Sequence, residues 1–95
     1  MGRYKITCYC SACNSPRGSR ETKSGAKATA GITVAVHPTK YVRNKEIYIE
    51  GIGRRKIQDV HGNAANVIDV YIGEFRRCQC SRHRYSGKTC NVTGL

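Results

Sequence analysis

The sequence predicts a small, mostly β barrel, and three observations lead to that prediction. Apolar and polar side chains alternate with period two along much of the chain, and helical periodicity is not evident. The alternating runs are short, and Gly-rich or polar segments separate them. With 95 residues the chain has room for one core. We therefore expect one mainly β domain, residues 1–95, built from six strands.

Six segments have the alternation of a strand. In chain order they are YKITCY (4–9), ITVAVH (32–37), EIYIEG (46–51), RKIQDV (55–60), NVIDVYIG (66–73) and KTCNVT (88–93). Residues 14–31 are rich in Ser, Thr, Gly and Lys and predict a long polar surface loop. The Cys-rich segment 74–90 opens with EFRRCQCSRHR (74–84), which predicts a short helix or an irregular excursion.

The fifth of these segments presents two different faces. One face carries three aliphatic side chains, Ile68, Val70 and Ile72. The other carries Val67, Asp69 and Tyr71. Asp69 is thus expected away from the most apolar face, where it can meet solvent or a ligand. In the fourth segment, alternation of side chains places Asp59 on the same face as Ile57, two residues earlier. Either the strand therefore ends at Asp59 or this carboxylate faces a groove.

Charge points to a polyanionic partner. The chain has seventeen Lys and Arg against six acidic residues, a formal net charge of +11. Nucleic acid, an anionic cell-wall polymer, or merely a soluble basic surface all fit this excess. The sequence contains neither a signal-peptide pattern nor an apolar run long enough to span a bilayer. We expect synthesis in the cytoplasm and no stable membrane insertion.

The chain has only two aspartates, Asp59 and Asp69, among its many cations. The simplest interpretation makes them ion-pair partners of Lys and Arg. The alternative is a site in which the two carboxyls work together.

The run KATAGITVAVHP…EIYIEGIGRRKIQDVHGNAANVIDVYIG, residues 27–73, resembles the 3D (three-aspartate) domain, and the upstream ITCYCSAC is similar to the Cys-rich opening strand of many members. The resemblance implies a double-psi β-barrel. It also implies the activity of the related membrane-bound lytic transglycosylase A family and of phage and stationary-phase muralytic proteins. These enzymes cleave the MurNAc–GlcNAc bond of peptidoglycan without water and leave a 1,6-anhydro product.

Residue by residue, the resemblance makes Asp69 the catalytic acid and base and Asp59 the second aspartate of the family. His37 stands where the family has its first aspartate, and His61 replaces the first Gly of a turn that is one residue shorter here. The candidate substrate-binding residues are His37, His61, Gly62, Asn66 and Tyr71; for the two histidines a structural role is the alternative. A nearby carboxylate such as Asp59 would raise the pKa of the acid.

The cysteines offer a second candidate site. Cys10 and Cys13 near the start and Cys78 and Cys80 near the end could supply four thiolates to a structural zinc ion. His83 and Cys90 are spare ligands. Unmodified thiols and disulfides remain alternatives, since an even number of cysteines also permits three disulfides. Catalysis itself needs no cofactor.

The resemblance implies a lytic transglycosylase, a phage endolysin that acts on peptidoglycan glycan strands of the cell wall after release, and the basic charge is consistent with an anionic wall. One alternative is a nucleic-acid-binding, zinc-stapled β-barrel module, which the charge and the tyrosines near Lys and Arg favour, although no RNP-like or zinc-finger pattern is present. Another is a noncatalytic wall-binding relative, which the histidine at position 37 would explain.

Overall fold

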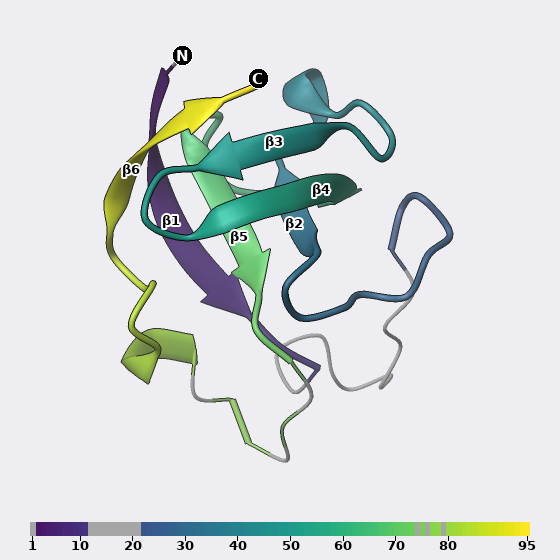
Figure 1. Cartoon of the computed structure of the whole chain (residues 1–95). Coiled ribbons are helices and arrows are strands. Elements are labelled where there is room, and N and C mark those ends of the chain that lie inside the picture. The colour runs from purple at the N-terminus through teal and green to yellow at the C-terminus, as the bar shows by residue number, and fades with distance from the viewer. Residues whose placement is uncertain (1, 12–21, 74, 76, 79) are drawn as a thin grey trace.

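The computed structural model describes residues 2–11, 22–73, 75, 77–78 and 80–95 (Figure 1). The strands are β1 (Gly2–Tyr9), β2 (Thr33–Val36), β3 (Glu46–Ile49), β4 (Gly53–Val60), β5 (Val67–Tyr71) and β6 (Thr89–Thr93). Two short 3-10 helices, η1 (Pro38–Lys40) and η2 (Cys80–Arg82), interrupt the connections. All six predicted strands are confirmed. In the part of the chain that the structure describes, neither helix has the length or apolar character needed to cross a membrane.

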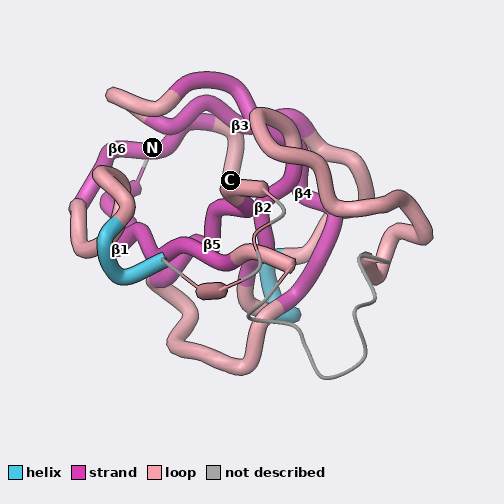
Figure 2. Tube along the Cα trace, turned by 90° about the horizontal axis from the view of Figure 1, so that it is seen from below, coloured by secondary structure: helices cyan, strands magenta, loops and turns pink. Residues whose placement is uncertain are grey.

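The strands close into a barrel in the order β1-β5-β2-β4-β3-β6, a ring that Figure 2 shows nearly end-on. The β1–β5 and β2–β4 pairs are parallel, and the other four are antiparallel. Strand β5 lies between β1 and β2, and β2 lies between β5 and β4. If β1, β2 and β3 are exchanged with β4, β5 and β6, respectively, the barrel keeps the same circular strand order, read in the opposite direction. This interlocking of two halves is the expected double-psi arrangement.

The inward faces of the strands form the main core. Its buried members are Tyr4, Ile6, Val34, Val36, Ile47, Ile49, Ile57, Ile68, Val70, Cys90 and Val92. The predicted apolar face of β5 is confirmed, because Ile68 and Val70 are core residues and Ile72 packs against them. Because side chains alternate between the two faces of each strand, every strand contributes buried side chains to the interior of the barrel.

A smaller cluster of Tyr9, Ala28, Ala35 and Tyr71 lies apart from the main core. Ala28 comes from the segment predicted as a polar surface loop. Residues 22–31 contain no helix or strand element, as a loop predicts. Thr22, Ser24 and Ala28 are nevertheless buried, so the loop does not lie wholly on the surface. Backbone contacts tie this segment to β4, where the Ser24 amide donates to the Gln58 carbonyl at 3.0 Å. Residues 14–21 of the predicted loop lie outside the described residues.

The segment predicted as a short helix or an irregular excursion is mostly irregular, with η2 as its one described helical turn. Residues 74, 76 and 79 of this segment lie outside the described part of the chain.

Candidate active site on the outer face of the barrel

Four neighbouring strands place one residue each in a row. In the strand register, Thr7 on β1 pairs with Asp69 on β5, and Asp69 pairs with Ala35 on β2. Ala35 in turn pairs with Asp59 on β4. Residues directly opposite one another share a face of the sheet, and here it is the face away from the core. The two aspartates therefore lie on the same face, two strand spacings or roughly 10 Å apart at the backbone.

A β-bulge in β4 brings Asp59 into this row. Ile57 is level with Val34 and Asp59 is level with Ala35, so β4 has one extra residue, Gln58, between these pairs. In a regular strand Asp59 would share the core-facing side with Ile57, and the extra residue moves it to the opposite face. The strand does not end at Asp59 but continues to Val60.

The carboxylate of Asp59 is held by backbone amides. Its Oδ1 accepts hydrogen bonds from the amides of Lys23 at 3.1 Å and Val60 at 2.9 Å. The first contact fastens the segment that starts at residue 22 to the end of β4. Asp59 thus has a fixed position at one edge of the site.

Asp69 is half-buried, and the hydroxyl of Thr7 donates a hydrogen bond to its Oδ1. Burial raises the pKa of this carboxyl above its usual value, and the negative charge of Asp59 raises it further. The Thr7 hydrogen bond and the electrostatic influence of His61 act in the opposite direction, but the net shift of the pKa is upward. A carboxyl that keeps its proton to higher pH can act as a general acid.

Simple ion pairing does not account for the two aspartates. Within the described ranges neither carboxylate forms an ion pair with Lys or Arg, and their hydrogen-bond donors are one hydroxyl and two amides. The arrangement therefore favours a site over a pair of surface salt bridges.

Tyr9 and Tyr71 form the wall of the site nearest the end of β1. Their rings meet edge to face with centroids 5.1 Å apart, and Tyr71 is only 2% exposed. Burial, followed by the charges of Asp59 and Asp69, raises the pKa of the Tyr9 hydroxyl far above its usual value. Tyr71, a predicted substrate contact, thus lies beneath the surface of the site.

The two histidines lie close together near the C-terminal ends of β2 and β4, with ring centroids 6.4 Å apart. Nε2 of His61 donates to the carbonyl of Val67 at 2.6 Å, and its Nδ1 accepts from the Asn63 amide at 3.1 Å. His37 caps η1, where its Nδ1 accepts from the Thr39 amide at 3.2 Å. Both rings are half-buried and have structural contacts.

The remaining predicted substrate contacts lie in the exposed turn between β4 and β5. Gly62 faces open space, since an added Cβ would meet no atom within 4 Å. Asn66 is exposed, and its carbonyl accepts from the Lys5 amide at 2.8 Å. The structure places both beyond the His61 end of the site.

Sequence reasoning did not find Thr7 or Tyr9. Both lie on β1, about sixty residues before their partners on β5, and the strand pairing alone brings them to Asp69 and Tyr71. The only signal was the alternation of β1, which gives Thr7 and Tyr9 one face but does not identify the neighbouring strand.

Three of the four predicted zinc ligands come together. Beyond the ends of β1 and β5 the chain segments stay side by side, since the amide of Ile72 donates to Tyr9 at 2.9 Å and that of Ser11 to Gly73 at 3.1 Å. The Sγ atoms of the three cysteines all lie within 4.8 Å of one another: Cys10, Cys78 and Cys80. Such a group could hold a metal ion.

The fourth predicted ligand, Cys13, lies outside the described residues. The spare ligands have other surroundings: Cys90 belongs to the main core, and the ring of His83 packs on Tyr85 with centroids 4.6 Å apart.

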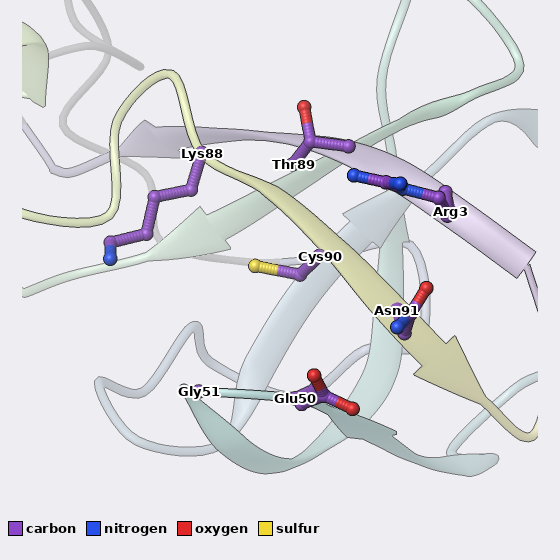
Figure 3. A pocket seen from close by; sticks show the side chains of 7 residues that line it. All are labelled: Arg3, Glu50, Gly51, Lys88, Thr89, Cys90 and Asn91. Atoms are coloured by element: carbon purple, nitrogen blue, oxygen red, sulfur yellow. The ribbon is translucent and has the colours of Figure 1, made fainter.

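A hollow of about 380 Å³ opens elsewhere on the barrel, between β1, β6 and the turn after β3. Figure 3 shows Arg3 and Lys88 along the β1 and β6 side of this hollow and Glu50 across from them. None of the residues that the sequence analysis singled out as catalytic or substrate-binding lines it.

Comparison with protein-family models and with curated proteins finds no match for this chain.

Proposed function

We propose that the protein is a lytic transglycosylase that cleaves the MurNAc–GlcNAc bond of peptidoglycan, with Asp69 as general acid and base. The observation that carries the proposal is the state of Asp69: a half-buried carboxyl, oriented by Thr7, with a raised pKa. The resemblance of residues 27–73 to the 3D domain supplies the substrate class. The proposed place of action is the bacterial cell wall, after release from the cell as a phage endolysin.

The chemistry needs one proton and returns it. Asp69 gives its proton to the glycosidic oxygen, the bond from that oxygen to C1 of MurNAc breaks, and an oxocarbenium-like sugar remains. The Asp69 carboxylate then takes the proton of the C6 hydroxyl while that oxygen bonds to C1. The products are the 1,6-anhydro sugar and a free GlcNAc hydroxyl, and no water is consumed.

Asp59 supports this cycle electrostatically. Its charge favours the protonated form of Asp69 before cleavage, and it also favours the positive charge that develops on the sugar. His37 lies at the same end of the strands, and its Nε2 can donate to the glycan because only its Nδ1 accepts from the Thr39 amide. His61 uses both ring nitrogens in contacts with the turn and orients this end of the site. Because His37 stands where the family has its first aspartate, Asp59 and Asp69 are the two carboxylates left for catalysis.

The test is digestion of purified sacculi, with mass spectrometry of the products. The wild-type protein should release fragments with anhydro ends, and Asp69→Asn should slow release by about a hundredfold or more, as expected for a positioned acid. Glu46→Gln, which removes an exposed carboxyl on β3, is the matched control and should retain the wild-type rate. Binding to sacculi without any fragments would instead identify a noncatalytic wall-binding protein.

We also propose that the cysteine cluster holds a structural zinc ion. Zinc bound tetrahedrally by thiolates at about 2.3 Å requires sulfurs roughly 3.8 Å apart, and small adjustments of the three Sγ atoms meet that requirement. The proposed fourth ligand is Cys13. Bound zinc would tie the end of β1 to the start of η2.

Elemental analysis of the purified protein should give about one zinc per chain. Cys78→Ser, at the exposed ligand, should lower the zinc content, whereas Cys90→Ala in the main core should leave it unchanged. Equal zinc contents in both variants and the wild type would reject these ligands.

Nucleic-acid binding is the second candidate, and one surface favours it. Beside η2 a hollow of about 300 Å³ is lined by Phe75, Arg82, His83 and Arg84, together with Ile72. The guanidinium of Arg84 lies 5.2 Å from the ring centroid of Tyr85. Cations next to aromatic rings suit single-stranded nucleic acid. Measured affinity for a single-stranded oligonucleotide should then fall steeply with salt, and Arg82→Ala should reduce the slope.

A further inference from the structure

The hydroxyl of Tyr9 is a polar group that the proposed cycle has not yet used. Tyr9 is 6% exposed, and among the described residues its oxygen has no hydrogen-bond partner. A buried donor without a partner is unfavourable, and native proteins retain few of them. Its retention beside a candidate active site therefore points to a role in that site.

The position of Tyr9 follows from strand pairing. It lies two residues after Thr7 on the same face of β1, diagonal to Asp69 across the β1–β5 pair, which an aromatic side chain can span. Its ring packs on Tyr71 and belongs to one cluster with Ala28 and Ala35.

The hydroxyl lies within the field of both carboxylates. Ala35 separates Asp69 from Asp59 in the row, and the ring of Tyr9 shares a cluster with it. The negative charges of Asp59 and Asp69 both act on the hydroxyl. The hydroxyl of Tyr9 is therefore a hydrogen-bond donor within the electrostatic influence of two acceptors.

We propose that Tyr9 is a positioning residue for the aspartate pair: its hydroxyl donates a hydrogen bond to the Asp69 carboxylate once Asp69 has given up its proton. This inference rests on the proposed function. In the structure Thr7 donates a hydrogen bond to Oδ1 of Asp69. Tyr9 would donate to Oδ2 once that oxygen has lost its proton and can accept. The diagonal position of Tyr9 relative to Asp69 on one face of the β1–β5 pair puts the carboxyl within the span of an aromatic side chain.

Other groups near Asp69 act on its ionisation as well. They are Asp59 at the end of β4, His61 beyond it, and Thr7 on β1. The ring of His37 lies next to that of His61, and Tyr71 lies on β5 opposite Tyr9. Lys23 faces Asp59 through its amide, while its Nζ lies 5.6 Å from the ring centroid of Tyr41. All of these remain in a Tyr9→Phe variant, so a change in that variant reports the hydroxyl alone.

The experiment compares Tyr9→Phe with Tyr48→Phe, a matched control in which the exposed tyrosine of β3 loses its hydroxyl. In Tyr9→Phe we expect kcat to fall about tenfold with little change in KM, since the donor serves the carboxylate and not the bound sugar. The alkaline limb of the pH profile should move to higher pH, because an ionised carboxyl without its donor binds a proton more tightly. The Tm should rise, since an unpaired buried hydroxyl is removed.

A second readout does not need activity. NMR titration of the Asp69 carboxyl carbon should show a higher midpoint in Tyr9→Phe than in the wild type and no change in Tyr48→Phe. If sacculi are not cleaved by the wild type, the proposed function fails, and this titration still decides the role of Tyr9. Unchanged midpoint and unchanged kcat in Tyr9→Phe would show that the ring only packs.

Discussion

At the scale of single residues, Asp69 is governed by opposing effects. Burial and Asp59 favour its protonated form, whereas Thr7 and His61 favour the carboxylate. The net result is a raised pKa, and a raised pKa has a consequence for stability. Below the pKa of the unfolded chain the protonated form contributes fully to stability, and this contribution is lost as the pH rises through the higher pKa of the folded state.

Asp69→Asn should remove that dependence, because the amide cannot ionise. Relative to the wild type, the Tm of the variant should rise as the pH increases from about 3 to 7, starting from a small difference at the acidic end. Thermal melts at several pH values measure this, with Glu46→Gln as the control. A difference in Tm that is the same at every pH would contradict the raised pKa.

Two further substitutions should move the alkaline limb of the activity profile in opposite directions. Asp59→Asn removes a charge that raises the pKa of Asp69, so the limb should shift to lower pH. Thr7→Val removes the donor that lowers this pKa, so the limb should shift to higher pH. Initial rates of sacculus digestion, measured across pH for each variant, give the position of the alkaline limb in both. Shifts of the same sign would show that the electrostatic description of the site is wrong.

At the scale of elements, the bulge in β4 is the feature on which the site depends. Its extra residue, Gln58, is buried and hydrogen-bonded: Thr33 donates to its Oε1 at 2.7 Å, and its Nε2 donates to Asn44 at 3.1 Å. Thr33 in turn accepts from the Thr29 amide at 2.9 Å. These hydrogen bonds connect the bulge in β4 to β2 and to residues 22–31.

Gln58→Ala should therefore be costly, by about 1–3 kcal/mol of unfolding free energy, because it leaves the buried hydroxyl of Thr33 without its acceptor. Denaturant titration measures the loss. Lys56→Ala, two positions earlier and exposed, should change stability by less than about 0.5 kcal/mol. Equal stabilities of the two variants would mean that solvent replaces the network at no cost.

At the scale of the whole molecule, closure of the barrel depends on the seam between β3 and β6. Only Tyr48 and Ile49 of β3 are in register with β6. Just beyond β6, Gly94 has a φ of +106°, and a Cβ there would lie 3.1 Å from the carbonyl oxygen of Glu46. The chain end can lie against β3 only because this residue has no side chain.

Gly94→Ala should loosen the seam and lower the unfolding free energy by about 1–3 kcal/mol. Gly51→Ala is the matched control: Gly51 has a φ of +85° but open space around its Cα, so it reports the backbone strain without the contact. The loss should be larger at Gly94, and hydrogen exchange of the β6 amides should quicken in that variant alone. A smaller loss at Gly94 than at Gly51 would contradict a tight seam.

The sequence by itself determined the number and places of the strands and the faces of β5, because alternation of side chains is a local property of a strand. It also singled out Asp59, Asp69 and the paired cysteine segments by residue type and spacing. Only the tertiary structure decided that Thr7 and Tyr9 meet Asp69, since pairing between strands sixty residues apart leaves no local mark. The bulge at Gln58 likewise became visible only in the register with β2, and it placed Asp59 on the face of Asp69 where simple alternation would have placed it in the core.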